Sequence, residues 1–125
     1  MPVPLPKIEH IYQYHLDSTR WERFSPRDDD IVIATSFKSG TTWMQMIVAQ
    51  LIFLDGEAHS LFEVSPWIDT VADSLDEVMN ILEAQKHRRF IKTHLPLNGL
   101  PYHPQVKYIV VARDARDVCM SLWNH

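Results

Sequence analysis

The sequence predicts an α/β protein with a mainly parallel β-sheet, and three observations lead to that class. The apolar, β-branched run IVIAT at 31–35 is typical of a strand buried on both faces of a parallel sheet. Two later apolar runs have strand length, and segments with helical spacing of apolar residues lie between and after these runs. Alternating strands and helices are the pattern of α/β folds. With 125 residues and 46% hydrophobic content, the chain can form one domain with its own core.

The N-terminal segment, residues 1–30, is predicted to be irregular, with one short helix from about Glu9 to Leu16. It contains several prolines and ends in the acidic triplet DDD at 28–30. The strand at 31–35 follows and begins the predicted α/β core, residues 31–125.

The first long helix is predicted from Thr41 to about Leu54, because its apolar residues recur at i, i+3, i+4, i+7 and i+8. These residues are Met44, Ile47, Val48, Leu51 and Ile52. Turn-forming residues at 55–60 end this helix. A second helix is predicted at about 74–85, with Ser74 as its N-cap and Glu77 three residues later.

Two further strands are predicted in RRFIKTH (88–94) and VKYIVVAR (106–113), separated by a proline-bearing loop. A last helix begins at about Ala115, and we expect its apolar residues Cys119, Met120 and Trp123 to lie in the core. This helix ends without a glycine cap, and three strands form a thin sheet. We therefore expect the chain to be part of a larger domain.

The charge and cysteine content exclude several classes. A net charge of −4 argues against a nucleic-acid or acidic-membrane partner. The single cysteine excludes an intrachain disulfide, and the N-terminus lacks the apolar run of a secretory signal. We expect a cytoplasmic protein.

All three predicted strands end in residues that can carry chemistry. The first runs into the loop 38–42, the second into Lys92 and His94, and the third into Arg113. Because ligands bind at the carboxyl ends of strands in open α/β sheets, these groups are predicted to converge on one site.

The loop KSGTT at 38–42 has the features of an anion site. Gly40 allows the backbone amides to curl around an anion, and Thr41 and Thr42 begin a helix whose dipole favours negative charge. The loop is not a Walker A motif, because Lys38 precedes the glycine. The alternative interpretation is an ordinary helix entry with a surface lysine.

The other candidates also have two interpretations each. His94 shares a face with Lys92 in an extended chain and can act as a general base, or it is an ordinary loop histidine. Arg113 can bind a phosphate, or pair with a neighbouring aspartate. Trp43 lies in the core or stacks on a base. The remaining histidines do not have the spacing of metal ligands.

Three segments resemble those of the cytosolic sulfotransferases. TSFKSGTTW (35–43) resembles their 5′-phosphosulfate loop, usually written TYPKSGTTW. KTHLPL (92–97) is similar to the segment with their catalytic histidine. YIVVARDARDVCMSLWNH (108–125) is similar to their 3′-phosphate segment, in which a serine follows an arginine by eight residues, here Arg113 and Ser121.

The resemblance implies a P-loop-like three-layer fold and transfer of a sulfuryl group from 3′-phosphoadenosine 5′-phosphosulfate (PAPS) to a hydroxyl or amine of a small molecule. It implies that the loop from Ser39 to Thr42 holds the 5′-phosphosulfate, and that Lys38 and Lys92 neutralise charge on the transferring group. It further implies that His94 is the general base. Adenine would stack on Trp43, and the 3′-phosphate would bind Arg113 and Ser121. No metal is implied.

The chain departs from the family pattern at three points. Ser36 and Phe37 replace the usual Tyr-Pro, and Asp114 replaces an asparagine, so we expect its carboxylate to turn towards Arg116. Members of the family are more than twice as long, and their C-terminal half, with the rest of the 3′-phosphate site and a dimer segment, has no counterpart here. A truncated, inactive nucleotide-binding fragment and a P-loop nucleotide kinase are the alternatives. The acceptor is not readable, although Phe24, Pro66 and Trp67 are expected to form part of its pocket.

Overall fold

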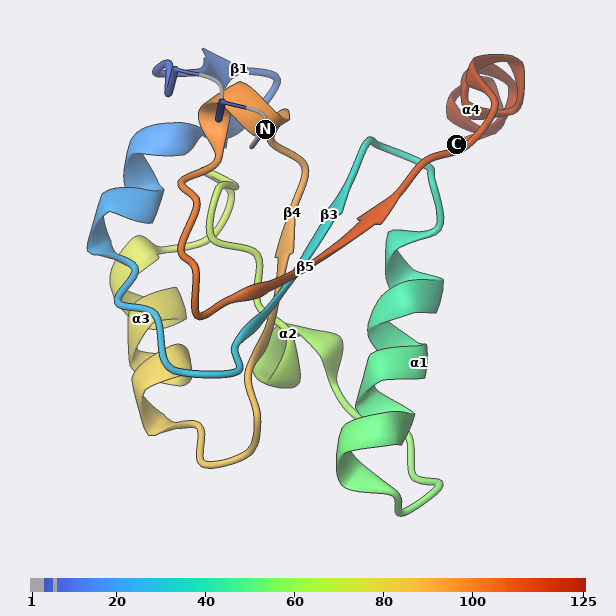
Figure 1. Cartoon of the computed structure of the whole chain (residues 1–125). Helices are drawn as coiled ribbons and strands as arrows, with labels where there is room; N and C mark the ends of the chain where they lie inside the picture. The colour runs from blue at the N-terminus through green and yellow to red at the C-terminus, as the bar shows by residue number, and fades with distance from the viewer. Residues whose placement is uncertain (1–3, 6) are drawn as a thin grey trace.

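The central element of the structure, a computed structural model that describes residues 4, 5 and 7–125, is a three-stranded parallel sheet (Figure 1). Its strands are β3 (Ile31–Thr35), β4 (Phe90–Thr93) and β5 (Lys107–Val111), in the order β4-β3-β5. Both β4 and β5 pair with β3 in parallel. The predicted strands and their parallel arrangement are confirmed.

Three of the four α-helices in the described residues were predicted, and the short second one was not. The four are α1 (Thr41–Phe53), the short α2 (Leu61–Val64), α3 (Leu75–Ala84) and α4 (Ala115–Trp123). The predicted N-cap of α3 is confirmed, since the Ser74 hydroxyl accepts a hydrogen bond from the Glu77 amide at 3.5 Å. None of the helices among the described residues is both long and apolar enough to cross a membrane.

Alternation along β3 produces three layers. Ile31 and Ile33 point to one face and pack with residues of α1, including Val48. Val32 points to the other face and packs with residues of α3, including Leu82. Because successive side chains of a strand point to opposite faces, α1 and α3 cover the sheet from opposite sides (Figure 1). The predicted three-layer α/β fold is confirmed.

The predicted N-terminal helix is wrong. Instead, β1 (Tyr12–Gln13) and β2 (Leu16–Asp17) form an antiparallel hairpin, followed by a 3₁₀ helix, Ser18–Arg23. A segment distant in sequence stabilises the hairpin, because Leu16 forms an isolated antiparallel bridge with Thr70. A tertiary contact therefore decides the conformation of a segment whose own sequence is ambiguous. A second 3₁₀ helix, Leu97–Gly99, lies in the loop before β5.

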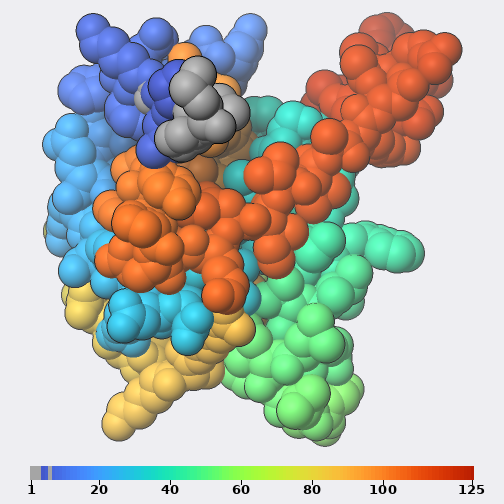
Figure 2. Space-filling view, viewed as in Figure 1, coloured from blue at the N-terminus to red at the C-terminus, as the bar shows by residue number. Residues whose placement is uncertain are grey.

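The prediction that Cys119, Met120 and Trp123 lie in the core is also wrong. Cys119 is exposed, and the side chains of Met120 and Trp123 are 61% and 86% exposed. The helix that carries them, α4, projects from the body of the structure (Figures 1 and 2). It has no buried residue, because no other described element packs against its apolar face.

Candidate active site

A cavity of about 560 Å³ lies at the carboxyl ends of the three strands. Its lining includes side chains that follow each strand: Lys38 after β3, His94 after β4 and Arg113 after β5. The sequence-predicted site residues that line it are Lys38, Gly40, Thr41, Thr42, Trp43, Lys92, His94, Arg113 and Ser121. The structure therefore brings together residues predicted from distant segments, and their individual chemical roles stay predictions.

Ser39 is the one predicted site residue outside this lining. Its side chain is buried, at 4% exposed, and its hydroxyl lies 2.6 Å from the Ser36 hydroxyl. A second hydroxyl pair, Thr35 with Thr41, joins the end of β3 to the start of α1. These two contacts close the loop at its base, so Ser39 shapes the loop from inside.

The backbone of the loop turns sharply at Lys38 and Gly40, which have φ values of 58° and 92°. The glycine tolerates this left-handed conformation without steric cost, and it is the N-cap of α1. No side chain caps α1, whereas Ser74 and Asp114 cap α3 and α4. The first amides of α1 therefore lack intrahelical and side-chain partners, and they lie where the helix dipole favours an anion.

The orientation of His94 is fixed by a hydrogen bond of 2.9 Å between its Nδ1 and the Thr35 carbonyl oxygen. Because a carbonyl oxygen only accepts, Nδ1 carries the proton, and Nε2 of the neutral ring carries the lone pair. Burial lowers the pKa of His94, and the nearby Lys92 charge lowers it further, although the Thr35 bond and Asp69 oppose both effects. The lowered pKa favours the neutral imidazole, which is able to accept a proton.

Two aromatic rings surround the His94 imidazole. Phe37 lies against it at 4.3 Å between ring centroids and an interplanar angle of 30°. Trp67 meets it edge to face at 4.9 Å. Both rings line the cavity and exclude water from the imidazole, which is the cause of its lowered pKa.

Lys92 also contacts Trp67, with Nζ 4.3 Å from the ring centroid. Burial lowers the pKa of its ammonium group, while the charges of Asp69 and Asp73 oppose that shift. The contact with the indole face stabilises a cation that burial would otherwise disfavour. Lys92 and His94 thus both line the cavity and contact Trp67.

Arg113 and Lys38 meet at the third strand end. Nη1 of Arg113 donates to the Lys38 carbonyl oxygen at 3.2 Å, and Lys38 Nζ lies 3.2 Å from Nδ1 of His125. Asp114 is turned onto Arg116, as expected, with a contact of 2.8 Å between Oδ2 and Nη2. Trp43 is 79% exposed, so the interpretation of Trp43 as a core residue is wrong.

The expected acceptor pocket is found only in part. Trp67 lines the cavity, and Pro66 is buried beside it. The prediction that Phe24 forms a wall of this pocket is wrong, because Phe24 is 7% exposed and packs edge to face on Trp21 in the core. The sequence reasoning missed Phe37 and the buried Asp69. An aspartate directly after the apolar SPWI stretch was the available signal for Asp69.

Among residues 4, 5 and 7–125, no cluster of three or more His, Cys, Asp or Glu side chains could hold a metal ion.

Comparison with known proteins gives the family. The family model described as "Sulfotransferase domain" matches residues 28–125. A glycolipid sulfotransferase from Mycobacterium tuberculosis is 47% identical over 108 residues, covering 85% of this chain and 33% of the relative. Sulfotransferase 1E1 from Homo sapiens is 34% identical over 110 residues, covering 82% of this chain and 37% of the relative. The chain belongs to the sulfotransferase family.

A solved structure supports the fold. Retinol dehydratase, crystallised with retinol and PAP (the desulfated product of PAPS), matches with a TM-score of 0.62 and 23% identity. The match covers 88% of this chain and 45% of that chain. The chain also spans only about a third of the length of the curated relatives described above.

Proposed function

We propose that this chain is the PAPS-binding part of a sulfotransferase that transfers a sulfuryl group to a hydroxyl or amine of a small molecule. One observation carries the proposal: three cations, Lys38, Lys92 and Arg113, surround an uncapped helix N-terminus and a neutral histidine in one cavity. No carboxylate among the described residues forms an ion pair with any of the three. Such an arrangement suits a ligand with several anionic groups.

The cofactor roles follow from position. The loop from Ser39 to Thr42, with its free amides, would hold the 5′-phosphosulfate, because it combines amide donors with the dipole of α1. Arg113 and Ser121, which also line the cavity, would hold the 3′-phosphate. Exposed Trp43 would stack on the adenine.

The chemical step would use the neutral His94 and the two lysines. Nε2 of His94 would take the proton of the acceptor hydroxyl while the acceptor oxygen forms a bond to sulfur. The bond between sulfur and the bridging phosphate oxygen would break, and its electron pair would leave on the phosphate. Lys38 and Lys92 would stabilise the negative charge that develops there.

The acceptor class is narrowed by the walls beside His94. Phe37 and Trp67 present apolar rings next to the proposed base, so the acceptor would carry an apolar group next to its reacting hydroxyl. The similarity to a glycolipid sulfotransferase is consistent with an amphipathic alcohol of this kind. A cytoplasmic location and a homodimer of the whole protein stay predictions.

Calorimetric titration of the chain with PAP tests the proposal. We expect saturable binding that Lys38→Ala weakens and Lys107→Ala leaves unchanged, because Lys107 pairs with Asp29 in the amino-terminal part of the sheet. A folded chain that does not bind PAP would contradict the assignment of the site to this part of the protein. His94→Ala distinguishes an enzyme from a binding fragment: an enzyme loses turnover and keeps PAP affinity, whereas a fragment has no turnover to lose.

A further inference from the structure

Asp69 is a buried carboxylate beside the cavity that the chemical step above does not use. It lies between α2 and α3 and has none of its surface exposed to solvent. A buried charge is costly unless its oxygens are satisfied by donors, so its partners show what it holds in place.

Three N–H groups from three different segments donate to this carboxylate. Oδ1 accepts from the indole Nε1 of Trp21 at 3.1 Å. Oδ2 accepts both from the indole Nε1 of Trp67 at 2.7 Å and from the backbone amide of His94 at 3.1 Å. A single oxygen atom thus joins the aromatic wall of the cavity to the backbone of the proposed base.

None of these three donors is charged, so the negative charge of Asp69 is hydrogen-bonded but not neutralised by them. Its charge acts on two titratable groups that line the cavity, Lys92 and His94. Its charge raises the pKa of Lys92 and of His94, opposing the burial that lowers both. Asp73 acts on Lys92 in the same direction.

We propose that Asp69 is a positioning residue of this site, holding the Trp67 ring and the His94 backbone in fixed relation and directing its charge towards Lys92 and His94. The inference rests on the proposed function, because it gives a role to Asp69 only if His94 and Lys92 do the chemistry. Fixing a base and a cation matters because small displacements of catalytic groups reduce rates strongly.

The test is the Asp69→Asn variant of the whole chain, studied by NMR without nucleotide. We expect the titration midpoints of the His94 imidazole and the Lys92 ammonium both to move to lower pH, since the charge that raises the two pKa values is removed. Asp69→Glu, which keeps the charge, should restore the midpoints at least in part. The matched control is Asp76→Asn, which removes an exposed aspartate from α3 and should shift neither midpoint.

A second measurement needs no variant, so it tests the proposal even if Asp69→Asn does not fold. In the unsubstituted chain, the indole N–H of Trp67 should exchange with solvent several-fold more slowly than those of Trp43 and Trp123, which are 79% and 86% exposed. Unchanged midpoints in folded Asp69→Asn, or exchange at Trp67 as fast as at Trp43, would overturn the proposal. Neither measurement uses PAP, so a failure of nucleotide binding would be recognised separately.

Discussion

At the amino end of the central sheet, Asp30 and Arg89 form an ion pair in which each side chain is 2% exposed. At the carboxyl end, the cations of Lys38, Lys92 and Arg113 have no carboxylate ion-pair partner among the described residues. The same strands, β3 and β4, separate the two regions. Charge is thus satisfied within the protein at one end and left available at the other.

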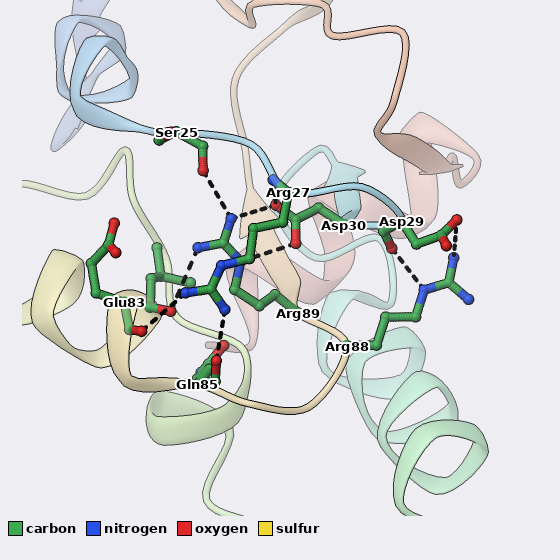
Figure 3. Close-up of polar contacts among 9 residues, drawn as sticks. Ser25, Arg27, Asp29, Asp30, Glu83, Gln85, Arg88 and Arg89 are labelled. Carbon is green, nitrogen blue, oxygen red and sulfur yellow. Dashed lines mark hydrogen bonds and ion pairs between the residues drawn. The ribbon is translucent and has the colours of Figure 1, made fainter.

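Figure 3 shows the polar contacts at the amino end. Nε of Arg89 donates to Oδ1 of Asp30 at 2.9 Å, and its Nη2 donates to the Ser25 carbonyl at 2.9 Å. Oδ2 of Asp30 also accepts from the Arg27 amide at 2.8 Å. The Arg27 guanidinium donates to the carbonyl oxygens of Glu83 and Gln85, at the C-terminus of α3. This cluster joins the N-terminal segment, β4 and α3.

The difference separates structural charge from functional charge. A buried pair whose charges neutralise each other is not available to a ligand, and its removal should affect folding. Cations around an uncapped helix contribute little to folding and remain free for an anion. Substitutions at the two ends should therefore alter different measured quantities.

The largest effect is expected at the amino end. Asp30→Ala leaves the Arg89 guanidinium buried without its partner, which should lower the free energy of unfolding by about 3–5 kcal/mol. Urea denaturation followed by tryptophan fluorescence measures it. The control is the neighbouring Asp29→Asn, which removes the charge from exposed pairs with Arg88 and Lys107 at 3.9 and 3.5 Å and should cost less than about 1 kcal/mol. Asparagine is used because Asp29 has a left-handed backbone, with φ at 67°, that alanine disfavours. Equal losses in the two variants would contradict the structural assignment of the buried pair.

The second effect is expected at the carboxyl end and in binding. Arg113→Ala should weaken PAP binding by roughly 10- to 150-fold. This factor corresponds to the loss of about 1.5–3 kcal/mol, the usual contribution of a hydrogen bond to a charged group. Stability should hardly change, because the Arg113 side chain is exposed and donates to the Lys38 carbonyl oxygen. Calorimetry with PAP measures the loss, and Arg116→Ala, whose arginine pairs with Asp114, is the control. Equal weakening in both variants would indicate a general charge effect instead of a site.

The third effect compares the two left-handed glycines. An added Cβ at Gly40 or Gly56 would meet no atom within 4 Å, so the cost of alanine is confined to the backbone, with φ at 92° and 68°. Each substitution should therefore lower the free energy of unfolding by about 1–2 kcal/mol. Only Gly40→Ala should also weaken PAP binding, because Gly40 lies in the anion loop and Gly56 does not. A loss of affinity in Gly56→Ala would contradict that distinction.

Much of the fold could be predicted because its signals are local. The apolar run at 31–35 and the helical spacing after Thr41 each lie within one element. The convergence of Lys38, His94 and Arg113 then followed from the rule that ligands bind at the carboxyl ends of parallel strands. The pairing of Arg113 with Ser121 in one role came from family resemblance, because their spacing alone does not indicate it.

The remainder depends on contacts between distant residues. Tyr12–Gln13 and Leu16–Asp17 are strands too short to show a period of two, and a bridge to Thr70 supports them. Asp69 accepts hydrogen bonds from residues 48 and 25 positions away, and its one local signal, the place after the apolar SPWI stretch, does not identify these partners. The exposure of α4 was not predicted, because an apolar helix face indicates burial but does not show whether another element packs against it.

The smallest expected effect concerns the cover over His94. Phe37 stands where the family usually has proline, and its ring lies against the imidazole at 4.3 Å. Burial is the main cause of the lowered pKa of His94, so Phe37→Ala should raise that pKa towards its ordinary value by admitting water. NMR titration of the imidazole measures the shift, and Phe37→Leu, which keeps an apolar cover, should move the midpoint less. Equal His94 titration midpoints in the unsubstituted chain, Phe37→Ala and Phe37→Leu would contradict this role of Phe37. The burial that lowers the His94 pKa would then come from Trp67 and not from Phe37.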